Sequence, residues 1–96
     1  MIRYLKNEEE FLELTSKGKV VVDFFAEWCG PCKIMGEILE NIDADIIKVN
    51  TDLFPDIAQK FGIMSIPTLI LFKDGSSSAK MIGLKSREEI LDFINK

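Results

Sequence analysis

The chain has 96 residues, of which 47% are hydrophobic and 29% charged, and its formal net charge at pH 7 is -4. This length predicts one domain, residues 1–96, near the lower limit for a chain that folds on a single core. The acidic balance argues against nucleic-acid binding, which needs a basic face. No apolar run is long enough to cross a bilayer, and residues 1–10 lack a signal-peptide pattern, so we expect a cytoplasmic protein without membrane contact.

The beginning of the chain predicts a short strand followed by a helix. Residues 2–5 form a short apolar run. Asn7 can cap a helix, because Glu10 stands three residues later as in a capping box. The helix is expected to end by Gly18 and to turn three apolar side chains inward, namely Phe11, Leu12 and Leu14.

Two buried strands are expected on either side of a second helix. Residues 20–25, VVVDFF, are β-branched and aromatic without alternation, which is typical of a central strand covered on both faces. Residues 46–50 predict a second such strand. Residues 29–42 have helical spacing, with an expected inward face of Ile34, Met35, Ile38, Leu39 and Ile42.

The second half of the chain predicts a short helix, a hairpin and a last helix. Pro55 can open a helix that runs through Phe61, with Gly62 as its end. Residues 68–72 form a third apolar strand. It is expected to turn at Asp74-Gly75 into a strand at about residues 80–84.

The hairpin and the last helix complete the predicted order. Ser76-Ser77-Ser78 is expected to be a loop tip, and Ser86 with Glu89 forms a capping box for a helix whose inward face is Ile90, Leu91, Phe93 and Ile94. The order is therefore βαβαβαββα. It predicts an α/β fold with a mixed sheet of about five strands and helices on both faces.

The two cysteines lie in Cys29-Gly30-Pro31-Cys32, where the first central strand meets a helix at the carboxyl end of the sheet. Structural zinc and iron–sulfur sites need four ligands, and the chain has two Cys and no His, which disfavours a metal site. A structural disulfide across two residues would remove little entropy from the unfolded chain.

Redox exchange fits the position of the pair better. Unsatisfied N–H groups and the dipole at a helix N-terminus favour a thiolate at Cys29. Gly30 lets the chain approach closely, and Pro31 suits the first helical turn. Cys32 lies three residues on, on the same side of the helix. We therefore expect Cys29 to be the nucleophile and Cys32 the resolving thiol.

Residues 24–33, FFAEWCGPCK, resemble the active-site segment of the thioredoxin family, and Ser65-Ile66-Pro67-Thr68 resembles its cis-proline segment. The resemblance extends over essentially the whole chain. It implies a thioredoxin fold, a cis bond before Pro67, and a protein-disulfide reductase without cofactor or metal. No His stands inside the motif, which favours electron donation over oxidation or isomerisation.

The resemblance also implies further site residues and partners. Asp23 would be a buried carboxyl with a raised pKa that transfers a proton for Cys32, the alternative being a solvated aspartate at a strand end. Lys48 is either an electrostatic partner of Asp23 or a lysine that reaches solvent. The implied partners are a thioredoxin reductase and disulfide-containing substrate proteins, and we expect a monomer. The implied substrate-binding surface consists of Trp28, Gly30, Pro31, Ile66, Pro67, Ile82 and Gly83.

Two other functional classes stay open from the residues alone. The chain could be a thioredoxin-like binding module or subunit with incidental redox activity, although binding alone needs neither the cysteine pair nor the proline and the aspartate beside it. A glutaredoxin-like enzyme is disfavoured, because the motif is not of the Cys-Pro-Tyr-Cys type.

Several positions depart from the family pattern. Phe25 replaces a frequent tryptophan. Glu37 stands where many members have a helix-kinking proline, with Gly36 before it, so the bend is expected either to persist at Gly36 or to vanish. The segment 40–46 is shorter than usual, and Phe54 replaces a polar cap before Pro55.

Overall fold

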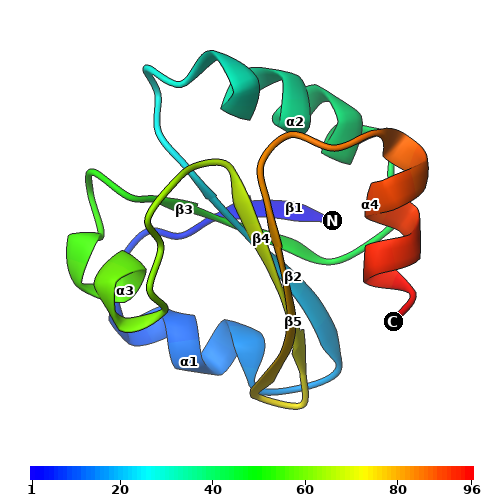
Figure 1. The fold of residues 1–96 in the computed structure, drawn as a ribbon. Helices are drawn as coiled ribbons and strands as arrows, with labels where there is room; N and C mark the ends of the chain where they lie inside the picture. Colours follow the sequence, from blue (N-terminus) through cyan, green and yellow to red (C-terminus); the bar gives the residue numbers. More distant parts are fainter.

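The computed structural model describes all 96 residues as one five-stranded sheet with four helices (Figure 1). The elements in chain order are β1 (Ile2–Tyr4), α1 (Glu9–Thr15), β2 (Lys19–Phe25), α2 (Gly30–Glu40), β3 (Ile46–Asn50), α3 (Pro55–Lys60), β4 (Thr68–Lys73), β5 (Ser76–Ile82) and α4 (Arg87–Ile94). The predicted order βαβαβαββα is confirmed. None of the helices has the length and apolar character needed to cross a bilayer.

The strands lie in the order β1-β3-β2-β4-β5, so β2 is the central strand. β3 runs parallel to both β1 and β2, whereas β4 is antiparallel to β2 and to β5. Because β2 and β3 are parallel, the loops that follow them leave the same edge of the sheet. Their register places Asp23 opposite Lys48, and the β1–β3 register places Tyr4 on the other side of Lys48.

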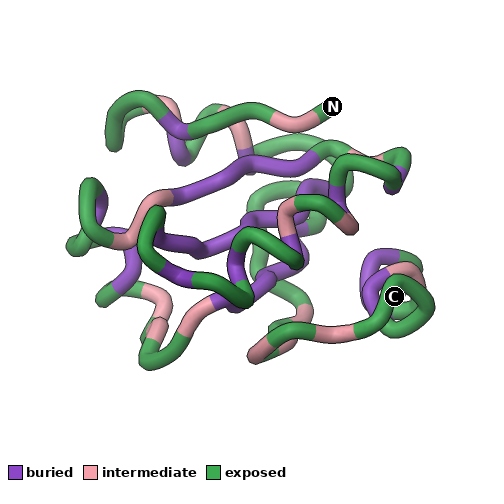
Figure 2. The backbone as a smooth tube through the Cα atoms, turned by 90° about the horizontal axis from the view of Figure 1, so that it is seen from above, coloured by how far each residue is buried: buried purple, intermediate pink, exposed green.

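The helices cover both faces of the sheet, α1 and α3 on one face and α2 and α4 on the other (Figure 1). The tube view shows the buried strands running between more exposed segments (Figure 2). Alternation along β2 divides its side chains between two apolar cores. The first core includes Phe11, Val22, Phe24, Ile57 and Phe72, and the second includes Val21, Met35, Leu39, Ile46, Leu71 and Ile90.

Three local predictions are wrong. Leu12 and Ile34 were expected to face inward, but their side chains are 72% and 50% exposed. On each helix, fewer apolar side chains are buried than the helical spacing of the apolar residues predicted. Phe11 and Thr15 are buried on α1, and Met35 and Leu39 are buried on α2.

The third wrong prediction concerns the hairpin. The serines at 76–78 belong to β5 and are not a loop tip. Asp74 and Gly75 both have positive φ, 48° and 89°, so the chain reverses within these two residues and pairing resumes at once.

The predicted caps at both ends of the chain are present. Asn7 accepts a hydrogen bond from the Glu10 N–H at 3.0 Å. The Ser86 hydroxyl accepts from the Glu89 N–H, and the Glu89 carboxylate accepts from the Ser86 N–H, both at 3.2 Å. Hydrogen bonds from the backbone and the hydroxyl of Ser86 lower the pKa of Glu89. The second cap holds α4, whose Ile90 and Phe93 enter the second core.

Ser86→Ala removes one side of this capping box, so we expect the free energy of unfolding to fall by about 1 kcal/mol. Urea denaturation followed by circular dichroism measures this change. Ser77→Ala, at an exposed position of β5, is the control and should change stability by much less. Equal losses for the two variants would contradict the role of the cap.

Candidate active site

The cysteine pair begins α2 at the end of the central strand. Cys29 is the residue before the first helical turn and has extended backbone angles, φ -87° and ψ 109°. Gly30 and Pro31 follow in the first turn, where the missing N–H of proline leaves no intrahelical hydrogen bond unmade. The sequence therefore starts the helix at this point and fixes Cys29 at its amino end.

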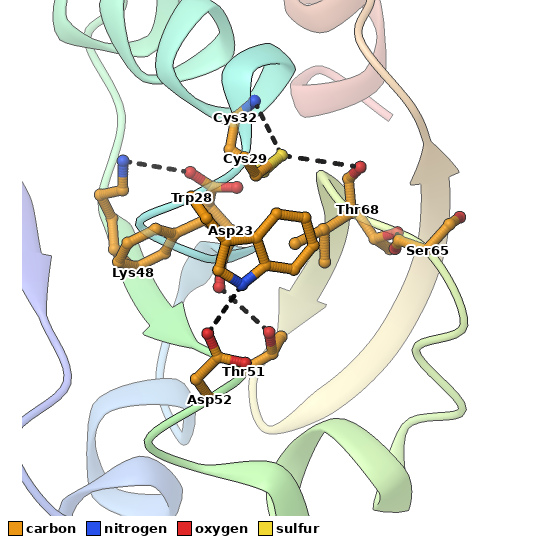
Figure 3. Close-up of a disulfide and its surroundings, with 11 residues drawn as sticks. Asp23, Trp28, Cys29, Cys32, Lys48, Thr51, Asp52, Ser65 and Thr68 are labelled. Carbon is orange, nitrogen blue, oxygen red and sulfur yellow. Dashed lines mark hydrogen bonds and ion pairs between the residues drawn. A yellow bond between two sulfur atoms is a disulfide. The ribbon is translucent and has the colours of Figure 1, made fainter.

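Cys29 and Cys32 form a disulfide with their Cα atoms 5.2 Å apart (Figure 3). The Cys32 N–H donates to the Cys29 Sγ atom at 3.2 Å. This N–H is one of the unpaired donors of the first helical turn, and it would also stabilise a thiolate at Cys29. Both cysteines are nearly buried, with 4% and 3% of their surfaces exposed.

The segment before β4 faces the disulfide. The Ile66–Pro67 peptide bond is cis, which confirms the bond that the family resemblance implied. The Ile66 carbonyl oxygen lies 4.0 Å from the Cys29 Sγ atom. The Thr68 hydroxyl donates to the Ser65 carbonyl at 2.8 Å, and the Gly83 N–H donates to the Pro67 carbonyl at 2.8 Å, so this segment is tied at both ends.

A groove of about 560 Å³ opens beside Cys29. We call it the front groove. Of the seven residues expected to bind substrate, Trp28, Gly30, Pro31 and Ile66 line it, whereas Pro67, Ile82 and Gly83 do not. Its other lining residues, which sequence reasoning missed, are Thr51, Ile63, Met64 and Ser65. Met64 is 95% exposed and extends the apolar rim of the groove.

Trp28 stands at the rim of the front groove with 72% of its surface exposed. Its indole N–H donates to the Asp52 carboxylate at 2.9 Å (Figure 3). Thr51, the residue before Asp52, donates its backbone N–H to the Phe25 carbonyl at 2.8 Å. Asp52 was not predicted, although its position two residues after the end of β3 was a usable signal, because parallel β2 and β3 end at the same edge.

Behind the disulfide lies a buried ion pair. Asp23 is fully buried, and its Oδ2 atom is 3.5 Å from the Lys48 Nζ atom (Figure 3). Neither carboxylate oxygen accepts a hydrogen bond from the protein. Burial raises the pKa of Asp23 from an ordinary 3.8 to about 6, and the Lys48 ammonium opposes part of that rise. The alternative of a solvated aspartate is therefore wrong.

Lys48 is also nearly buried, with 8% of its surface exposed. Its Nζ atom lies 4.7 Å from the centre of the Phe25 ring and 5.5 Å from that of Tyr4, so both rings contribute cation–π attraction. Lys48 therefore lies beside Asp23, as an electrostatic partner would, while its side chain also borders an open cleft.

A second opening, of about 270 Å³, reaches Lys48 from the side away from the front groove. We call it the rear cleft. It touches Cys32, whereas the front groove touches Cys29. Its lining residues are Tyr4, Phe25, Ala26, Glu27, Cys32, Lys33, Gly36, Glu37, Glu40 and Lys48. The two cysteines therefore border different openings.

A disulfide at the start of a helix, a cis-proline segment against it and a buried carboxyl behind it define a protein that exchanges dithiol and disulfide. The family model described as Thioredoxin matches residues 3–96, and the chain belongs to the thioredoxin family. It is a thiol–disulfide oxidoreductase that acts as a protein-disulfide reductase. The interpretation as a binding module with incidental cysteines is not favoured.

Individual relatives agree with this assignment. The chain is 44% identical over 93 residues to thioredoxin from Chlamydia caviae, covering 92% of this chain and 91% of that protein. It is 46% identical over 95 residues to thioredoxin from Chlamydia pneumoniae, covering 94% and 93%. The solved structure of a mutant thioredoxin from Halobacterium salinarum superposes with a TM-score of 0.90 at 31% identity, covering 98% of this chain and 88% of that one.

The buried Asp23 predicts a pH-dependent stability. Its pKa rises from 3.8 to about 6 on folding, so the unfolded chain releases the proton first. The contribution of Asp23 to the free energy of unfolding therefore falls as pH rises from 3.8 to about 6 and stays level above that range. Asp23→Asn cannot titrate. We expect its stability relative to the wild type to rise by about 3 kcal/mol across this window, since each pH unit between the two pKa values corresponds to about 1.4 kcal/mol.

Urea unfolding of the oxidised protein between about pH 3.5 and about pH 8 measures this difference. Asp43→Asn, at an exposed position, is the control for the amide substitution itself. A difference between Asp23→Asn and the wild type that stays level with pH would show that Asp23 does not titrate as a buried carboxyl.

Proposed function

We propose that this protein donates electrons to disulfides of other proteins, with Cys29 as nucleophile and Cys32 as resolving thiol. The Cys29 thiolate attacks one sulfur of the substrate disulfide, a mixed disulfide forms, and the other substrate sulfur leaves as a thiolate. Cys32 then attacks the Cys29 sulfur, and the second substrate sulfur leaves. Two electrons pass from the dithiol to the substrate, which takes up two protons, and the Cys29–Cys32 disulfide remains.

One observation carries the division of roles between the cysteines. Cys29 is at the amino end of α2, accepts the Cys32 N–H, and lines the front groove. A substrate protein seated in that groove meets Cys29 first. Cys32 lies behind it, within reach of the Cys29 sulfur, as resolution of a mixed disulfide requires.

Asp23 is proposed to take the proton from Cys32 when Cys32 attacks the mixed disulfide. A general base works best when its pKa lies close to the working pH, and the pKa of Asp23, about 6, meets that condition better than an ordinary aspartate. Lys48 is proposed to hold this pKa within a useful range, since its ammonium favours the ionised carboxylate.

The front groove is proposed to receive an extended segment of the substrate. Its rim is apolar at Trp28 and Met64, and the Asp52 hydrogen bond fixes the orientation of the indole ring. The groove residues Gly30, Pro31 and Ile66 would contact the segment near Cys29. Beyond the groove, the same substrate segment is proposed to contact Pro67, Ile82 and Gly83.

The proposed partners are disulfide-containing substrate proteins and a thioredoxin reductase that restores the dithiol. A monomer is proposed, because one chain supplies both cysteines and the whole front groove. A cytoplasmic location is proposed because a dithiol donor has to be kept reduced between turnovers, and that compartment maintains thiols in the reduced state.

Substitution of each cysteine tests the division of roles. Cys29→Ser should abolish reduction of insulin disulfides by dithiothreitol-charged protein. Cys32→Ser should still attack and should accumulate a mixed disulfide with the substrate, which non-reducing electrophoresis and mass spectrometry detect. Mixed disulfides that accumulate on Cys29→Ser instead would reverse the assignment.

Met64 tests the proposed groove. Met64→Ser removes exposed apolar surface from the rim, so we expect KM for a protein disulfide to rise about three- to tenfold, with kcat little changed, because uniform binding is lost. Leu12→Ser is the matched control, since Leu12 is also largely exposed but lies on α1 and outside the groove. An equal rise in KM for the two variants would contradict substrate binding at the groove.

A further inference from the structure

Gly36 lies in the interior of α2, where the backbone conformation does not require a glycine. It lies four residues after Cys32, within the helix Gly30–Glu40. Its φ is not among the positive values found at Gly18, Gly62, Gly75 and Gly83. Because glycine weakens a helix interior relative to alanine, another constraint must favour it here.

The constraint is the end of the Lys48 side chain. A Cβ atom at Gly36 would lie 3.0 Å from the Lys48 Nζ atom, which is the one atom outside the adjacent residues and the helix's own backbone that would come within 4 Å. That contact is tight, so the ammonium would have to move by a few tenths of an ångström to admit a Cβ atom. The Lys48 ammonium thus lies against the space that a side chain at residue 36 would take.

Three other groups surround the same ammonium. The Asp23 carboxylate lies at 3.5 Å, and the rings of Phe25 and Tyr4 lie at 4.7 Å and 5.5 Å. Figure 3 shows the Lys48 side chain pointing at the Asp23 carboxylate. A side chain at residue 36 would therefore displace the ammonium from its present position, and the rear cleft, which Gly36 and Lys48 both line, is the space into which the lysine can move.

We propose that Gly36 is a positioning residue, whose missing side chain leaves the room in which the Lys48 ammonium lies against Asp23. This inference deepens the proposed proton transfer, and any effect of Gly36 on turnover rests on that proposed function. The effect of Gly36 on the position of the ammonium is independent of the proposed function and can be measured separately.

The rear cleft offers the displaced ammonium other partners. Three carboxylates line it, and each could attract Lys48 away from Asp23. The titratable groups around the cleft are Tyr4 from β1, Glu27 from the loop after β2, Lys48 from β3, and Cys32, Lys33, Glu37 and Glu40 from α2. In the oxidised protein Cys32 does not titrate, which leaves Asp23 as the buried group that responds near neutral pH.

The test is a titration of the Asp23 carboxyl carbon by ¹³C NMR in the oxidised protein. With Gly36→Ala, a retreat of the ammonium by about 0.5 Å would raise the midpoint by about 0.4 pH unit at an effective dielectric constant of about 20. Gly36→Leu fills more of the space, so the midpoint should rise by about 1 pH unit. Ile34→Ala, at an exposed position of the same helix, is the control and should leave it unchanged.

A second background separates positioning from a general disturbance of the helix. In Lys48→Met protein the Gly36 substitutions should no longer move the Asp23 midpoint. An unchanged midpoint in both Gly36 variants, or an equal rise with Lys48→Met, would overturn the inference. If Gly36→Leu does not fold, Gly36→Ala decides, because alanine favours the helix.

Stopped-flow measurement of mixed-disulfide resolution against pH then tests the link to turnover. The pH profile of each Gly36 variant should move upward with its NMR midpoint. A midpoint that moves while the profile stays fixed would reject the proposed role of Asp23 and leave the positioning role of Gly36 intact.

Discussion

The parallel pairing of β2 with β3 determines where the chemistry of this protein lies. It sets Asp23 opposite Lys48 inside the sheet, and it ends both strands at one edge, so the loop carrying Cys29 leaves beside the loop carrying Asp52. A slip of one residue would turn Lys48 to the other face and leave Asp23 without its cation. The apolar side chains on both faces of β2 and β3 prevent that slip, because they would enter the wrong core.

The buried charge of Asp23 costs stability at neutral pH. Burial raises the pKa of Asp23 to about 6, so near pH 7 the carboxylate is charged in a place that disfavours charge, and the Lys48 ammonium offsets only part of the cost. The two apolar cores carry the stability that permits this. A carboxyl at the centre of the sheet adds nothing to packing, whereas one that titrates near neutral pH suits the proposed proton transfer.

The sequence predicted the element order, the central strands and the cysteine site, because these depend on local periodicity, caps and a specific motif. It did not predict that Leu12 and Ile34 are exposed. Apolar spacing shows which residues of a helix can face inward, but the neighbouring elements set how wide a stripe is buried. The same limit applies to Met64, which lines the groove beside Cys29, and to Asp52, which accepts a hydrogen bond from Trp28, because both come from loops distant in sequence. The absent side chain at Gly36 gave no positive signal, since its meaning depends on where the end of a lysine from another strand lies.

The arrangement of the two openings has a consequence for how the proposed reaction is ordered in space. A protein seated on Trp28 and Met64 covers the front groove and meets Cys29, whereas the rear cleft at Cys32 and Lys48 lies on the other side of the disulfide. Sulfur exchange with the partner then takes place on one side of α2. Lys48, the proposed partner of Asp23, lines the rear cleft and not the front groove. Asp23, the proposed proton acceptor, is already fully buried in the free protein, so a partner seated in the front groove finds no exposed surface of that carboxyl to desolvate.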